Sequence, residues 1–247
     1  MNLQQVLRTG RDGILYTLLG ISFALLLGWG LGKALAVPRT SSFLISVSTG
    51  ICGDNAIAAV GPVVGANDEE MSVSLGTVFI LNAVGLFAFP WLGHVLRLSQ
   101  QQFGIWAALA IHDTSSVVGA TTKYGSIALL TATTIKLTRA LWIIPIAFAA
   151  ALMSHRRAKV RVPWFILGFL VAVVITTYAP TELKPSLQIV NHLGKIGLTV
   201  TLFLIGMGIS RATITKVGVR PLLQGIILWA AVAVVSLLLI RYGIAAQ

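Results

Sequence analysis

Two short polar stretches interrupt the apolar sequence, and they carry the residues best suited to chemistry. One spans residues 111–116, where a histidine and an aspartate are followed by three hydroxyl residues. The other spans residues 50–57 and contains an aspartate followed by an asparagine. An ionisable side chain at membrane depth is costly and is by default a candidate functional residue. We therefore interpret both stretches as breaks in helices that meet around one site.

The residues around each acidic side chain are suited to begin a helix. Asn55 follows Asp54, and Ser115 and Ser116 follow Asp113; aspartate, asparagine and serine are all favourable helix N-caps. The first backbone N–H groups of a half-helix have no partner and lie at the positive end of its dipole, which favours an anion. We expect Asn55, Ser115 and Ser116 to bind a small anion, as discontinuous helices do in secondary transporters.

A basic pair lies further along the chain. Lys136 and Arg139 are three residues apart and share one helix face. If they face the site, they balance the charge of the anion. Two alternatives stay open: pairing with Asp113 or Asp54, which lowers the cost of both charges, and snorkelling to the membrane interface.

His112, Asp113 and Asp54 are the candidate groups for carrying a coupling proton. Histidine titrates near neutral pH, so His112 beside Asp113 could relay protons. Neighbouring residues do not share a helix face, so this relay requires an unwound backbone. The structural alternatives are a hydrogen-bonded interfacial histidine and aspartates that act only as helix caps.

Composition places the chain in a membrane. The sequence has 247 residues, of which 56% are hydrophobic and 10% charged, whereas soluble domains carry about 25% charged residues. The net charge of +11 would indicate nucleic acid in a soluble protein. Here the basic residues gather in loops, as in cytoplasmic loops of membrane proteins, so we expect the lipid bilayer and no nucleic acid as partner. The only cysteine is Cys52, and no zinc-type Cys/His spacing occurs, so we expect no disulfide within the chain and no metal or cofactor.

We predict an all-α, polytopic membrane helix bundle that forms one domain over residues 1–247. Apolar runs near the ~20 residues that cross a bilayer give about eight segments: 14–36, 43–66, 71–95, 103–121, 126–152, 162–180, 187–209 and 214–241. Segments 43–66 and 103–121 are the broken or re-entrant ones. The first apolar run is longer than that of a signal peptide, so we expect it to be retained.

The segments also form a weak internal repeat. Aligning the two polar stretches places Asp54 on Thr114, and Pro90 and Pro145 then fall at matching places, where each is expected to kink a helix. Basic loops at 155–161 and 211–220 should be cytoplasmic.

Two topologies fit these loops. If every segment spans the membrane, Lys33 and Arg39 lie inside, Asp68 to Glu70 lie outside and both termini are outside. If the broken segments are re-entrant hairpins, they enter from opposite sides and the repeat is inverted, as is common in secondary transporters.

Four motifs resemble those of the YeiH-type bacterial inner-membrane proteins. They are Gly50–Ala59, Ile111–Ala120, Lys136–Pro145 and Val162–Phe165, and the resemblance covers essentially the whole chain. Members are described as uncharacterised or as candidate sulfate exporters, so the resemblance implies a multi-pass inner-membrane transporter of a small sulfur oxyanion. Asp54 departs from the family pattern, in which this residue is more often small or uncharged. Members usually have further hydrophobic segments before the point where this chain starts, which implies a short form.

The leading hypothesis is therefore a secondary transporter, not an enzyme, that exports sulfate, sulfite or a related organosulfur anion in a proton-coupled manner. A passive anion channel is the first alternative, since it needs no coupling group. A membrane-embedded aspartyl protease is the second, because Asp54 and Asp113 could share a proton, although the residues around Asp113 do not match that family. The substrate, the coupling ion, the direction and the oligomeric state, a homo-oligomer included, stay open.

Overall fold

The computed structural model describes residues 3–153, 164–178 and 217–242, together with residues 189–194 and a few single or paired residues between 180 and 203. Most of the predicted segment 187–209 lies outside the described residues, as do the basic loop at 155–161 and most of the one at 211–220.

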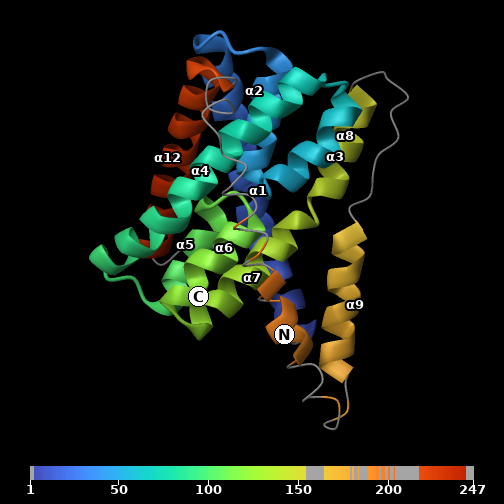
Figure 1. Cartoon of the computed structure of the whole chain (residues 1–247), viewed down its shortest axis with the longest axis vertical. Helices are drawn as coiled ribbons and strands as arrows, with labels where there is room; N and C mark the ends of the chain where they lie inside the picture. The colour runs from blue at the N-terminus through green and yellow to red at the C-terminus, as the bar shows by residue number, and fades with distance from the viewer. Residues whose placement is uncertain are drawn as a thin grey trace.

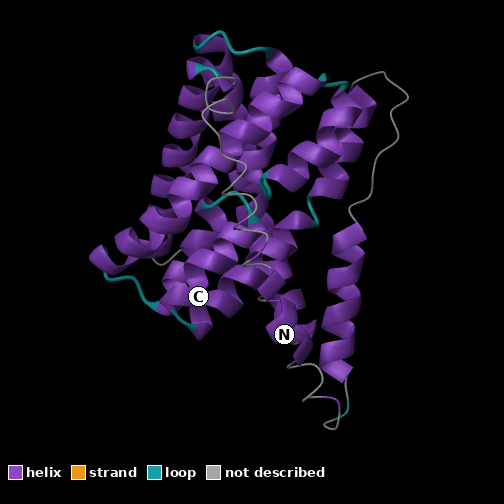
Figure 2. Ribbon diagram, in the orientation of Figure 1, coloured by secondary structure: helices purple, strands orange, loops and turns teal. Residues whose placement is uncertain are grey.

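Every long element in the described part of the chain is a helix (Figures 1 and 2), so the predicted all-α membrane bundle is confirmed. The helices are α1 (Leu3–Ala34), α2 (Arg39–Gly50), α3 (Asp54–Val64), α4 (Asp68–Val95), α5 (Gln100–Ala110), α6 (Thr114–Tyr124), α7 (Ser126–Ala140), α8 (Ile143–Met153), α9 (Trp164–Tyr178) and α12 (Val219–Arg241). Within the described residues, four stretches are long and apolar enough to cross a membrane: Thr17–Ala34, Asp68–Val95, Ser126–Leu152 and Val219–Arg241.

The two interrupted segments are re-entrant hairpins. Helices α2 and α3 pack against each other, and the loops before α2 and after α3 lie at the same end of the molecule, at the top of Figure 1. Helices α5 and α6 form a second hairpin that enters from the other end. The topology in which every segment spans is wrong, because it put Lys33 and Asp68 on opposite sides.

Each hairpin is followed by a span, and the second pair runs opposite to the first. Helix α4 descends after the first hairpin in Figure 1, whereas α7 and α8 together ascend after the second. Helices α3 and α6 have 11 residues each. The weak internal repeat is thus an inverted one. Pro145 lies close to the break between α7 and α8, but α4 continues through Pro90 without interruption.

Small residues bring α2 close to its neighbours. A Cβ atom added at Gly28 or Gly32 of α1 would overlap the side chain of Ser46 or Ser42 of α2. Gln224 of α12 is fully buried, and its Nε2 donates to Ser42 Oγ at 2.7 Å and to Gly28 O at 3.0 Å. Close backbone approach and interhelical hydrogen bonds are what hold helices together in lipid, so α1 and α12 fix the position of the first hairpin.

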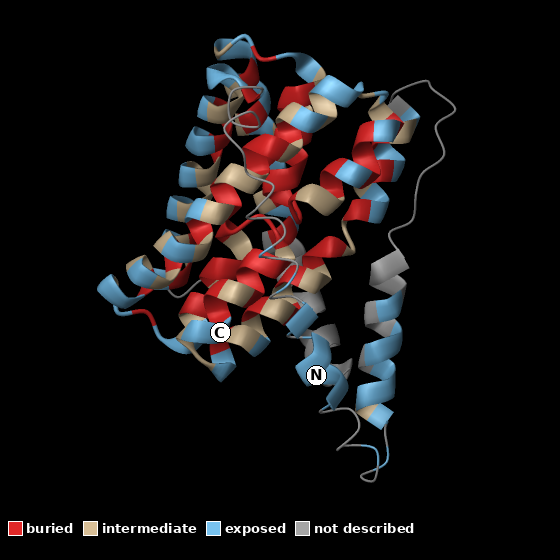
Figure 3. Cartoon of the chain, viewed as in Figure 1, coloured by how far each residue is buried: buried red, intermediate tan, exposed pale blue. Residues whose placement is uncertain are grey.

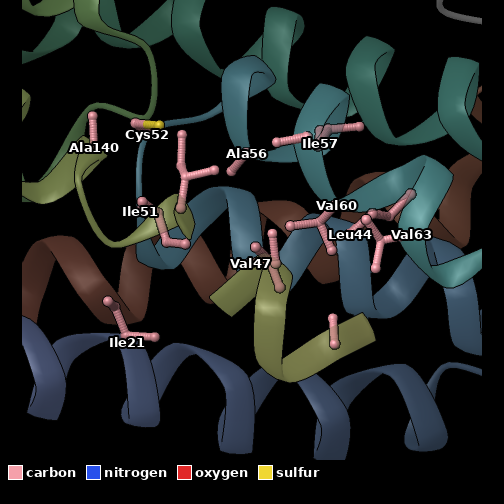
Figure 4. Packing of buried hydrophobic residues seen from close by; sticks show 14 of the residues in the cluster. Ile21, Leu44, Val47, Ile51, Cys52, Ala56, Ile57, Val60, Val63 and Ala140 are labelled. Carbon is pink, nitrogen blue, oxygen red and sulfur yellow. The ribbon is translucent and has the colours of Figure 1, made fainter. Parts of the chain in front are cut away.

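Burial is concentrated around the hairpins, and the outer helices expose apolar side chains, as expected against lipid (Figure 3). Figure 4 shows Ile51, Ile57 and Val60 of the first hairpin packed in one cluster with Ile21 of α1 and Ala140 of α7. A second cluster surrounds α5, α6 and α12. The polar ends of both hairpins are therefore enclosed by packed side chains.

Candidate binding site where the two hairpins meet

The two helix breaks touch each other through their main chains. Gly53 precedes α3 with φ 71°, a conformation that other residues rarely adopt. A Cβ atom at Gly53 would lie 3.1 Å from the carbonyl carbon of His112 and 3.2 Å from the amide nitrogen of Asp113. The sequence placed both breaks around one site, and the structure brings them into contact.

Asp113 closes the start of α6. Its Oδ2 accepts hydrogen bonds from the backbone N–H of Ser116 at 3.1 Å, from Ser116 Oγ at 3.3 Å and from Ser115 Oγ. Asp113 is thus an N-cap inside the bundle. The Ser115 and Ser116 side chains, predicted to bind an anion, point their hydroxyl groups at this carboxylate.

The start of α3 is built differently. Gly53 is its N-cap residue and supplies no side-chain hydrogen bond. Asp54 and Asn55 are half-buried, and Asn55 Nδ2 lies 3.4 Å from Asp54 Oδ1. The acidic residue of this hairpin therefore lies in the first turn of α3, beside its N-terminal amides.

Lys136 and Arg139 reach the junction from α7. Their side chains are 1% and 3% exposed, which excludes snorkelling to the interface. Lys136 Nζ donates to the carbonyl oxygens of Ile111 at 2.6 Å and of Ala108 at 3.3 Å, at the end of α5.

Arg139 joins both hairpins. Its Nη1 donates to the carbonyl oxygens of Ala108 at 3.1 Å and Leu109 at 3.2 Å, in α5. Its Nη2 donates to the carbonyl oxygen of Gly50, which is the last residue of α2. The carbonyl end of a helix carries a partial negative charge. The two basic residues thus neutralise the carbonyl ends of both first half-helices.

His112 lies in the unwound residues between α5 and α6, as a proton relay would require. Its Nε2 is 3.0 Å from Thr49 Oγ1, and that hydroxyl donates its only hydrogen to Ile45 O at 2.8 Å. The hydrogen-bond network therefore assigns the ring hydrogen to Nε2. His112 Nδ1 is buried and has no hydrogen-bond partner, so it is an open acceptor.

Asn82 is a member of the site that the sequence analysis missed. It lies in the interior of α4, and its Oδ1 accepts the backbone N–H of Asp113 at 3.2 Å. It is the only side-chain amide in residues 71–93. That isolated amide within an apolar run was the available signal, because polar groups inside membrane helices are generally paired or functional.

The junction combines anion-favouring and proton-accepting groups. Two cations, two carboxylates and one histidine converge there from α3, α7 and the break before α6: Lys136, Arg139, Asp54, Asp113 and His112. Within the described residues, no three or more His, Cys, Asp or Glu side chains are grouped so as to hold a metal ion.

Re-entrant hairpins in an inverted repeat, joined at a buried polar junction, define a polytopic membrane protein with a central site. The chain belongs to the family described as "Conserved hypothetical protein 698", whose profile matches residues 1–225. It is 51% identical over 250 residues to a UPF0324 membrane protein of Bdellovibrio bacteriovorus, covering 98% of this chain and 77% of the relative. A UPF0324 membrane protein of Porphyromonas gingivalis is 52% identical over 241 residues, covering 96% of this chain and 73% of the relative.

A UPF0324 membrane protein of Geobacter sulfurreducens is 47% identical over 241 residues, covering 98% of this chain and 77% of the relative. No solved structure matches the chain. These findings confirm the family resemblance and the multi-pass membrane location in bacteria. The names of the relatives state no substrate.

Proposed function

We propose that the protein is a secondary transporter that binds a small anion where the two hairpins meet. The observation that carries this proposal is that Lys136 and Arg139 donate to carbonyl groups at the ends of both α2 and α5. A transported cation would use carbonyl oxygens at such ends, and here it would be repelled by the two positive charges that already lie there. The N-terminal end of α3 remains without a side-chain cap, and such an end favours an anion.

The arrangement of the hairpins supports a carrier. Hairpins that enter from opposite ends and belong to an inverted repeat allow a central site to be opened to either side by moving one repeat unit against the other. At Gly53 the contact between the hairpins involves main chain on both sides.

Proton coupling follows from the charges at the junction. Lys136 and Arg139 offset two ionised carboxylates, so an arriving anion gains no net attraction while both Asp54 and Asp113 are ionised. A proton on one carboxylate leaves one positive charge in excess. Asp113 Oδ2 already accepts hydrogen bonds from Ser115 and Ser116, which favour its ionised form. Asp54 is therefore the carboxylate that we expect to take the proton.

The anion itself is proposed from the family resemblance: sulfite, sulfate or a related sulfur oxyanion, moved outward. A carrier that moves proton and anion together runs in the direction set by the two gradients combined. Outward movement then occurs when the internal concentration of the anion is high.

The test is flux of sulfite and sulfate in proteoliposomes under an imposed pH gradient. We expect gradient-driven flux with the native chain, loss of flux in Lys136→Gln and normal flux in Lys123→Gln, which alters an exposed lysine at the end of α6. Flux that ignores the gradient would identify a channel. Absence of flux for both anions from a well-folded native chain would refute the proposal.

A further inference from the structure

We propose that Asn82 is a ligand of the transported anion and donates a hydrogen bond to it from Nδ2. This inference rests on the proposed function and adds a donor from α4 to the same site. It also narrows the substrate to oxyanions.

The nitrogen of the Asn82 side chain is buried without a partner. The residue is 4% exposed, and Nδ2 has no hydrogen-bond partner. Buried polar groups are almost always paired, and an unmade hydrogen bond in a low-dielectric interior is costly. A bound substrate is the partner that would satisfy this group during transport.

The orientation of the amide is fixed by its other contact. The backbone N–H of Asp113 can only donate, and it lies 3.2 Å from the Asn82 side-chain oxygen. The oxygen must therefore face Asp113, which leaves the nitrogen as the open group. An open N–H group requires an acceptor, so it fits an anion and opposes a cation.

The amide also lies at the crossing of the hairpins. The Asp113 amide nitrogen that Asn82 binds is the atom that a Cβ at Gly53 would approach to 3.2 Å. Asn82 therefore lies beside the start of α3, whose N-cap supplies no side-chain hydrogen bond. An anion held there would meet donors from two elements, the amide of Asn82 and the first turn of α3.

Donors that arrive from two helices favour a ligand with several acceptor atoms. An oxyanion can direct one oxygen to Asn82 Nδ2 and another to the amides of α3. A halide presents a single centre. We therefore infer that the site prefers oxyanions such as sulfite to halides of the same charge.

The test compares Asn82→Leu with the native chain in proteoliposomes, using sulfite as the probe and chloride as competitor. Loss of one hydrogen bond to a charged ligand should raise the KM for sulfite by about ten- to a hundredfold, with a smaller change in kcat. Asn82→Gln, which keeps the amide on a longer stem, should recover part of the affinity. Chloride should compete more strongly in Asn82→Leu than in the native chain.

The matched control is Gln224→Leu, the same kind of change at a buried amide that binds Gly28 and Ser42 away from the crossing. It should lower thermal stability and leave the KM for sulfite within about twofold. If Asn82→Leu does not fold, the rise in melting temperature that sulfite gives the native chain should be reduced in Asn82→Gln.

An unchanged KM in a folded Asn82→Leu would overturn this inference alone, as would undiminished stabilisation by sulfite in Asn82→Gln. A native chain that transports neither sulfite nor sulfate would overturn the proposed function, and the ligand assignment with it.

Discussion

The two helix breaks occupy equivalent places in the repeat, but the helices that follow them are capped differently. The break before α6 is closed by side chains: Asp113 caps the helix, His112 binds Thr49, and Asn82 binds the Asp113 amide. The break before α3 is built on Gly53, which has no side chain to offer. The start of α6 is thus capped by side chains, whereas the start of α3 has no side-chain cap.

From this difference we infer separate roles for Asp54 and Asp113, which the sequence could not distinguish. Asp113 is held by hydrogen bonds that stabilise the fold, whereas Asp54 lies half-buried in the first turn of α3, where an anion would bind. An anion beside an ionised Asp54 would be repelled, since like charges at short range disfavour each other. The anion and a proton on Asp54 should therefore bind together.

The largest expected effect on stability comes from adding a side chain at Gly53, in the break before α3. Gly53→Ala places a Cβ about 3 Å from main-chain atoms of His112 and Asp113 and keeps a left-handed φ. We expect a loss of at least ~3 kcal/mol in the free energy of unfolding, measured by thermal unfolding in detergent. Gly85→Ala is the control, because its Cβ would lie 3.4 Å from the Trp229 ring, an ordinary contact. Equal stability of the two variants would show that the hairpins do not cross at Gly53.

The next effect concerns the cation that joins the two hairpins. Arg139→Gln leaves carbonyl groups of both α2 and α5 without their charged donor, and we expect a loss of about 3 kcal/mol. Lys136→Gln affects only α5 and should cost less, by the same thermal measurement. Arg139→Lys should recover little of the lost stability, because an ammonium group cannot reach both helix ends as the planar guanidinium does. Full recovery in Arg139→Lys would contradict the bridging role.

The sequence located the two helix breaks but left open whether their segments span or re-enter, and it did not predict the contacts between them. Asp54, His112 and Asp113 stood out because charged residues are rare in apolar runs, and this located both breaks. The carbonyl partners of Lys136 and Arg139 could not be predicted, since they depend on how α7 crosses the two hairpins. Asn82 was missed because an uncharged amide gives a weaker signal than a charge, and its contact with Asp113 exists only after folding.

A smaller effect should distinguish the two aspartates by stability. Asp113→Ala removes the cap of α6 and should cost about 1–2 kcal/mol, whereas Asp54→Ala should change the free energy of unfolding by less than ~0.5 kcal/mol. Chemical denaturation in mild detergent would measure both. A larger loss in Asp54→Ala than in Asp113→Ala would mean that Asp54 is the structural residue.

The smallest effect tests the link between the second break and α2. His112→Ala and Thr49→Val each remove one side of the hydrogen bond between Nε2 and Oγ1. We expect a coupling free energy of about 1 kcal/mol in a double-mutant cycle. Additive losses would indicate that the two side chains are independent.

The central claim is that the uncapped start of α3, with Asp54 in its first turn, binds the anion and the proton. The most direct measurement is sulfite flux per folded protein in proteoliposomes, with and without a pH gradient, for Asp54→Asn and Asp113→Asn. We predict that Asp54→Asn still transports but no longer responds to the gradient, while Asp113→Asn responds as the native chain does. A response to the gradient that survives in Asp54→Asn and disappears in Asp113→Asn would contradict the claim.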